Sequence, residues 1–61
     1  MNINPQPLAY SVPDAAHKLG ISIRKTWQLI EEERLRSFKV GRCRRVSHDA
    51  LVELVGELEA S

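Results

Sequence analysis

The connection between two neighbouring amphipathic segments constrains this chain more than any other feature. Ser11 is a candidate N-cap for the first segment, with Asp14 three residues later, and Gly20 is its candidate stop. Ser22 is a candidate N-cap for the second segment. Only Gly20 and Ile21 then remain between the two segments, so the sequence predicts a pair of short helices joined by a tight turn.

Both segments carry apolar residues at helical spacing. The predicted core residues of this helix pair are Val12, Ala15, Ala16, Leu19, Thr26, Leu29 and Ile30. The second helix must then turn a polar and charged face outward, formed by Arg24, Lys25, Gln28, Glu31 and Glu32. Trp27 falls on the boundary between the two faces. A helix pair of this kind, with a short turn that contains glycine, has the layout of a helix-turn-helix.

Residues 34–46 lack helical spacing, and their apolar residues Phe38, Val40 and Val46 flank Gly41, which predicts a β-hairpin. The register of the hairpin depends on its loop length. A two-residue loop that starts at Gly41 would put Val46 on the opposite face from Phe38 and Val40. A loop longer by one residue would gather all three apolar side chains on one face. We therefore expect the longer, three-residue loop.

Ser47 is a candidate N-cap for a last amphipathic helix. Its two faces consist of Ala50, Leu51, Leu54, Val55 and Leu58 on the apolar side and Glu53 and Glu57 on the acidic side. The element order helix, turn, helix, hairpin, helix is that of a winged helix-turn-helix. We therefore expect a mainly α fold with a small β-hairpin wing.

The 61 residues suffice for one small domain. We expect residues 1–7, which hold two prolines, to form a flexible arm. An extended piece at residues 8–10 should lead from the arm into a single domain that covers residues 8–61.

The size of the chain argues for a binding module rather than an enzyme. A single core of this size buries about 60% of the surface that the unfolded chain exposes and leaves roughly 3–5 kcal/mol of stability, so no enclosed active site is expected. Cys43 is the only cysteine and cannot form an internal disulfide or hold zinc alone. We expect no catalysis, cofactor, metal or small-molecule ligand. No apolar run approaches the ~20 residues of a membrane span, and we place the protein in the cytoplasm.

The net charge of +1 hides a strong asymmetry. Residues 18–45 hold all nine Lys and Arg side chains against three glutamates, a local charge of +6, whereas residues 1–17 carry −1 and residues 46–61 carry −4. A cationic middle segment favours a focused contact with a polyanion. We expect its cations to converge on one continuous surface that fits a duplex.

Short motifs spread over most of the chain match those of a known family. They are YSVPDAA at residues 10–16, LGIS at 19–22, LI at 29–30, KVGR at 39–42, RV at 45–46 and AL at 50–51. With these motifs in this order, the chain resembles the small excisionase-type DNA-binding domains, which are related to the MerR-like winged helix-turn-helix proteins. Three residues depart from the family pattern: Lys25 where Thr is usual, Glu33 where Gly ends the second helix, and Arg44 where the wing often has an aromatic residue.

The resemblance implies a recombination directionality factor, a protein that binds and bends double-stranded DNA at a phage attachment site and helps an integrase to run the excision reaction. We expect a chain without an effector domain, which suits this role better than that of a metabolite-responsive regulator. Its partners would be attachment-site DNA, an integrase and neighbouring copies of itself along the DNA. The alternatives are a small MerR-like or phage transcriptional regulator and an interaction module that never touches DNA.

The second helix supplies the candidate base-reading residues, because the early residues of that helix enter the major groove in a helix-turn-helix. Arg24 and Gln28 lie one turn apart, and their side chains suit guanine and adenine respectively. Lys25 is expected to contact a phosphate. For Trp27 two interpretations stay open: an indole N–H that donates to a phosphate while the ring packs on the wing, or a core tryptophan.

The hairpin supplies the other DNA-binding candidates. In the expected register Arg42 lies at the tip, from which it can reach a narrow, A·T-rich minor groove. Lys39 and Arg45 should share the outer face, and with Arg44 they would hold the flanking phosphates. The acidic faces of residues 31–33 and of the last helix are interpreted as solvated. A second hypothesis sets the last helix against the basic surface of a neighbouring copy.

Overall fold

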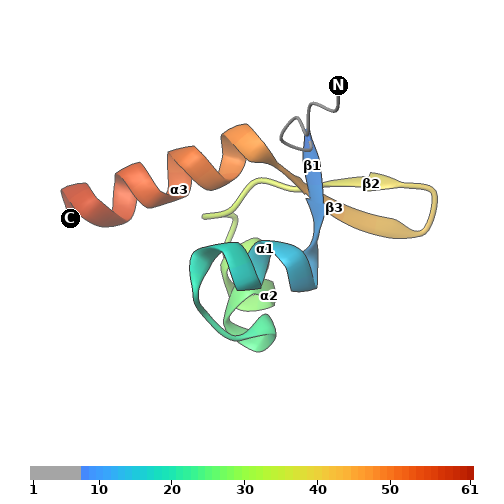
Figure 1. Ribbon diagram of the computed structural model, residues 1–61, viewed down its shortest axis with the longest axis horizontal. Helices are drawn as coiled ribbons and strands as arrows, with labels where there is room; N and C mark the ends of the chain where they lie inside the picture. The colour runs from blue at the N-terminus through green and yellow to red at the C-terminus, as the bar shows by residue number, and fades with distance from the viewer. Residues whose placement is uncertain (1–7) are drawn as a thin grey trace, which may run out of the picture.

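The computed structural model describes residues 8–61, and the arm expected over residues 1–7 lies outside the described residues. Figure 1 shows the arrangement of the elements. They follow the order β1 (Ala9–Ser11), α1 (Val12–Leu19), α2 (Ile23–Glu31), β2 (Phe38–Val40), β3 (Cys43–Ser47) and α3 (His48–Ala60). This mainly helical fold with a small hairpin confirms the predicted winged helix-turn-helix.

The three serines predicted as N-caps begin the three helices. Ser11, Ser22 and Ser47 are extended, and each hydroxyl accepts a hydrogen bond from the backbone N–H three residues later, at 3.2 Å, 2.9 Å and 3.0 Å. These bonds satisfy backbone donors that have no partner within the helix. The start of every helix is therefore encoded by a local side-chain contact.

Both helices of the pair end in a left-handed residue. Gly20 adopts a φ of 74° and ends α1 as predicted. After α2, Glu33 adopts a φ of 62°. The N–H groups of Glu33 and Arg34 donate to the carbonyls of Ile30 and Leu29 at 3.0 Å each, which is the hydrogen-bond pattern of a Schellman motif. Glu33 thus occupies a left-handed conformation that has a steric cost for glutamate but none for glycine.

The strands form one antiparallel sheet with the order β1-β3-β2. The extended piece expected before α1 is strand β1, and it pairs with β3 so that Tyr10 lies opposite Val46. Next to this pair, the N–H of His48 donates to the carbonyl of Leu8 at 2.9 Å. The central strand β3 is therefore paired on both sides.

The expected three-residue hairpin loop is wrong. Val40 pairs with Cys43, so the loop consists of Gly41 and one further residue. The φ of Gly41 is 62°, which suits the first position of a type II′ turn. The reason for the shorter loop is that Val46 is fully buried, whereas Phe38 and Val40 are 43% and 58% exposed on the other face. The core thus determines the orientation of β3, and the apolar residues of the hairpin do not gather on one face.

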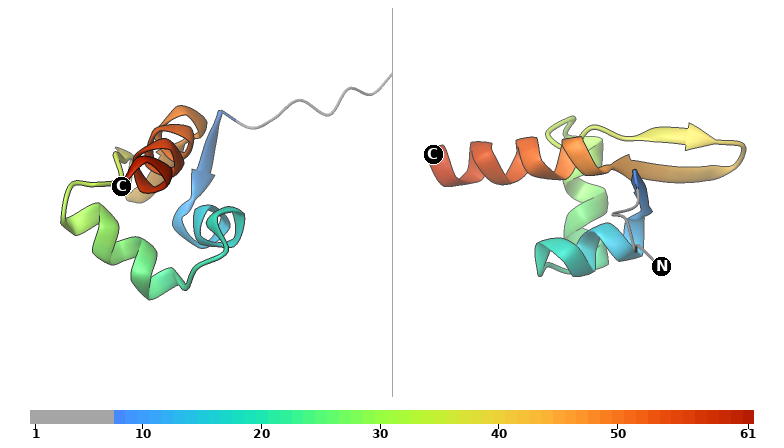
Figure 2. Two further views of the ribbon diagram at one scale, coloured as in Figure 1. Left: turned by 90° about the vertical axis from the view of Figure 1, so that its left-hand side faces the viewer. Right: turned by 45° about the horizontal axis from the view of Figure 1, so that its top comes forward.

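One core joins the sheet to the helices. Its buried members are Tyr10, Ala15, Leu29, Leu35, Val46, Ala50, Leu51 and Leu54. Thr26 is also buried, and its hydroxyl donates to the carbonyl of Ser22 at 2.9 Å. The predicted apolar stripe of α3 is buried only in its first half, because Val55 and Leu58 are exposed. The second half of α3 extends from the body of the domain (Figures 1 and 2).

Candidate nucleic-acid interface

The outward face of α2 is displayed as its spacing predicts. Thr26 and Leu29 are buried, which leaves Arg24, Lys25 and Gln28 exposed. Arg24 and Gln28 are four residues apart and are therefore neighbours on the helix surface. The first half of α2 thus offers two cations and an amide to a partner.

Gln28 has a partner that the sequence analysis missed. Its Nε2 atom donates to Oε2 of Glu32 at 3.2 Å on the exposed face. The spacing of four residues could have revealed this pair, because such neighbours form side-chain hydrogen bonds on helices. The bond uses one N–H of the amide and leaves the Oε1 atom and the second N–H for other partners.

Trp27 lies between α2 and the hairpin. It is 41% exposed and lies outside the core cluster, so the interpretation as a core tryptophan is wrong. Trp27 and Arg44 line two hollows between α2 and β3, of about 700 Å³ and 270 Å³. The indole ring therefore stands beside the base of the wing. Its contact with a phosphate stays a prediction.

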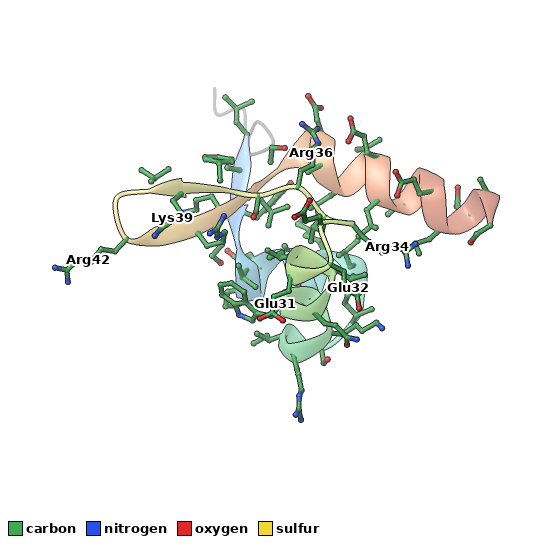
Figure 3. The ribbon with its side chains drawn as sticks, turned by 180° about the vertical axis from the view of Figure 1, so that it is seen from behind. Glu31, Glu32, Arg34, Arg36, Lys39 and Arg42 are labelled. Atoms are coloured by element: carbon green, nitrogen blue, oxygen red, sulfur yellow. The ribbon has the colours of Figure 1, made fainter. Side chains whose placement is uncertain are left out.

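The larger hollow has mixed charge. Glu31 and Glu33 line it together with Arg36 and Arg44, and Figure 3 shows Glu31 and Glu32 at the end of α2 that lies nearest to the hairpin strands. Carboxylates at this end of α2 repel phosphates. The cationic surface of the helix is thus confined to its first half.

The corrected register separates the hairpin cations. Lys39 lies opposite Arg44 on the face of β3 that carries Val46, whereas Arg45 lies opposite Phe38 on the other face. The prediction that Lys39 and Arg45 share the outer face is therefore wrong. The reason is the shorter loop. With one residue fewer in the loop the register shifts by one, so each β3 side chain lies on the opposite face from the expected one relative to the side chains of β2.

Arg44 and Arg45 are both half-buried but have different neighbours. Nη1 of Arg44 donates to the hydroxyl of Ser37 at 3.1 Å. Arg45 pairs with Ser11 of β1, which brings it to the start of α1. The smaller hollow joins these two arginines to Pro13 at that helix start.

Arg42 occupies the tip of the wing, as predicted. It is exposed, and its side chain reaches beyond the loop at the end of the molecule opposite α3 (Figure 3). This is the position from which an arginine can enter a groove next to the one occupied by a recognition helix.

The nine cations do not form one continuous surface. Arg34 and Arg36 lie beside α3 (Figure 3), and Nε of Arg36 is 2.9 Å from Oε1 of Glu53. Nζ of Lys18 lies 5.7 Å from the ring centroid of Tyr10. The expected single ridge is therefore wrong, because Arg36 and Lys18 have partners within the domain and Arg34 lies on the α3 side, away from the hairpin cations. The other six lie on the first half of α2 and on the hairpin.

Of three comparisons with known proteins, one finds a match. A family model described as a helix-turn-helix domain matches residues 9–58. Neither the curated proteins nor the solved structures contain a match to the chain. Each helix within residues 8–61 is too short or too polar to span a lipid bilayer.

Proposed function

The chain belongs to the helix-turn-helix domain family, and on that premise we propose that it is a DNA-bending protein of the excisionase type. Helix-turn-helix domains bind DNA with their second helix in the major groove. The proposal adds three things to sequence-specific DNA binding: the residues that read the site, a bend in the DNA, and a role in integrase-mediated excision.

The observation that carries the proposal is the separation of two exposed cationic elements. Arg24 and Lys25 project from the first half of α2, and Arg42 projects from the wing tip. With the recognition helix in the major groove, the wing would be in position to reach the adjacent minor groove. An arginine inserted there favours a narrow, A·T-rich groove. Binding at both places favours a bent duplex over a straight one.

Base reading falls to Arg24 and Gln28. Arginine pairs with the two acceptors of guanine, and each good bidentate contact contributes about 1–3 kcal/mol of discrimination. The hydrogen bond from Gln28 to Glu32 leaves one N–H and one carbonyl oxygen on the amide, which is the pair of groups that adenine requires. Glu32 thus supports a defined orientation of the reading amide.

Phosphate contacts are assigned to the other cations of α2 and the hairpin. Lys25 lies beside the base-reading residues, and Lys39 and Arg44 lie on the same face of the hairpin. Arg45 stands at the start of α1, where backbone N–H groups also attract anions. If about five phosphates are neutralised, log affinity falls with log salt concentration at a slope of about −4 to −5.

The excisionase role rests on the resemblance of the motifs described above. In this role the bend brings the arms of an attachment site together, and an integrase and neighbouring copies of the chain are the protein partners. DNA bending and contact with neighbouring proteins both require only exposed surface, and a small domain has that surface.

The test is a gel-shift assay with attachment-site DNA in which the site occupies different positions along the fragment. We expect a specific complex whose mobility depends on that position, because a central bend slows migration more than a terminal one. Integrase-dependent excision should rise when the protein is added. A specific complex without bending or effect on excision would instead indicate a transcriptional regulator, and a salt slope near zero would overturn DNA binding altogether.

A further inference from the structure

The wing carries an exposed apolar side chain next to its loop. Val40 is 58% exposed and lies outside the core cluster. It pairs with Cys43, which is also exposed, and this pair closes the loop that holds Arg42. Opposite residues of antiparallel strands project to the same face. The end of the wing, residues 40–43, therefore combines a small apolar surface with the arginine that reaches beyond the loop (Figure 3).

The charge around this end of the wing favours a polyanion as its partner. Residues 34–48 contain six Lys and Arg side chains and no Asp or Glu. Among the described residues that line the 270 Å³ hollow beside the loop, three are arginines and none is acidic. A second copy that met Val40 with its own wing would bring two such cationic hairpins together, which like-charge repulsion disfavours. A nucleic-acid duplex presents the opposite charge.

The size of the apolar surface separates DNA from a protein partner. Of residues 40–43, only Val40 and Cys43 have apolar side chains. Phe38 is two residues farther from the loop, about 7 Å along the strand, and lines the larger hollow together with Glu31 and Glu33. A stable protein interface buries about 800 Å² on each partner, whereas a wedge between two base pairs is a single apolar side chain. The end of the wing has the size of a wedge.

We propose that Val40 enters the minor groove beside Arg42 as a wedge and partly unstacks one base step. This inference rests on the proposed function, because it requires the wing in the minor groove, and it assigns the bend to one side chain. Apolar side chains inserted in this way kink a duplex by about 20–90° toward the major groove. The favoured step is T–A, which is easily kinked and also keeps the groove A·T-rich for the arginine.

The test uses the full chain and the attachment-site duplex that gives the specific complex. Energy transfer between dyes at the two ends of the duplex reports the bend, and 2-aminopurine in place of single adenines reports unstacking. We expect one T–A step whose 2-aminopurine fluorescence rises about twofold or more on binding, together with an increase in energy transfer. Replacement of that step by the stiffer A–A should reduce the bend.

Three variants assign the signals to the wedge. Val40→Ala shortens the side chain and should lose most of the fluorescence rise and of the bend, while the salt slope stays unchanged because Arg42 remains. Val40→Leu keeps an apolar wedge and should retain both signals. Val52→Ala makes the same change at a valine of α3 that is 57% exposed and should also retain both. Circular dichroism checks the fold of each variant.

The wedge is overturned if Val40→Ala bends the duplex as the wild-type chain does, or if Val40→Leu loses the signals together with Val40→Ala. A bend with no rise in 2-aminopurine fluorescence at any step also overturns it and leaves the proposed DNA bending in place. Absence of a specific complex with the wild-type chain overturns the proposed function itself. A dimer in sedimentation equilibrium that Val40→Ala abolishes would make a second copy the partner of this surface, against the proposal.

Discussion

Val46 of β3 lies directly opposite Tyr10 of β1, and both side chains are buried in the core. This single pairing determines which face of β3 points inward. It therefore also determines the register of the hairpin on the other side of β3, and with it the positions of the hairpin cations.

Substitution of the two hairpin valines tests this register. Val46→Ala should lower the free energy of unfolding by about 2 kcal/mol, because it removes buried methyl groups and leaves a cavity. Val40→Ala should change the free energy of unfolding by less than about 0.5 kcal/mol, because Val40 is exposed. Urea unfolding followed by circular dichroism measures both values. Equal losses in the two variants would speak for the three-residue loop.

The left-handed residue after α2 offers a stabilising substitution. Glu33→Gly should raise the free energy of unfolding by about 1 kcal/mol, because glycine adopts a φ of 62° without steric cost. Glu32→Gly is the matched control, since Glu32 has a φ of −81° and gains nothing from glycine. Thermal unfolding should show a higher Tm for the first variant alone. A lower Tm for Glu33→Gly would mean that the Glu33 carboxylate stabilises the protein by more than the left-handed backbone of this residue destabilises it.

The pair formed by Gln28 and Glu32 predicts two effects of opposite sign. Glu32→Ala should strengthen DNA binding overall, because a carboxylate leaves the cationic surface, and should weaken discrimination at the base that Gln28 reads. Glu31→Ala removes the same charge without touching Gln28 and should strengthen binding with specificity intact. Competition binding with single-base variants of the site measures both effects. Discrimination that survives Glu32→Ala unchanged would show that the hydrogen bond does not orient the amide.

Base reading by Gln28 itself is tested separately. Gln28→Ala should reduce discrimination at one base position by about 1–3 kcal/mol and leave the other positions unaffected. The same competition assay gives this value. A uniform loss across all positions would assign Gln28 to the phosphates.

The wing tip is tested by its salt dependence. Arg42→Ala should weaken binding to every sequence and make the slope of log affinity against log salt shallower by about 1. Arg36→Ala removes the same charge from a side chain paired with Glu53 beside α3 and should leave the slope unchanged. Fluorescence anisotropy over a range of salt concentrations provides the slopes. Identical slopes for the two variants would exclude the wing tip from the interface.

Local signals in the sequence were sufficient for the helices. Ser11, Ser22 and Ser47 cap helices through contacts only three residues long, and Gly20 ends α1 through its own backbone. Such contacts depend on neighbours in the chain, so residue type and spacing predict them. The exposed face of α2 followed from the same periodicity.

Contacts between distant residues account for what the sequence did not reveal. The hairpin register depends on the pairing of β1 with β3, and the apolar pattern of residues 34–46 does not contain that information. The core role of Leu35 depends on its position after the strained turn at Glu33. The apolar stripe of α3 was evident from spacing, but spacing cannot tell whether another element reaches Val55.

The sheet order β1-β3-β2 also bears on how the protein is made. The first described strand pairs with β3, which follows α1, α2 and β2 in the sequence, so a growing polypeptide that stops short of β3 lacks both the sheet and Val46. Cooperative folding of a small domain leaves no stable half-formed product. Synthesis on the ribosome must therefore have passed β3 before the domain can fold, and truncations that remove β3 should yield unfolded chains.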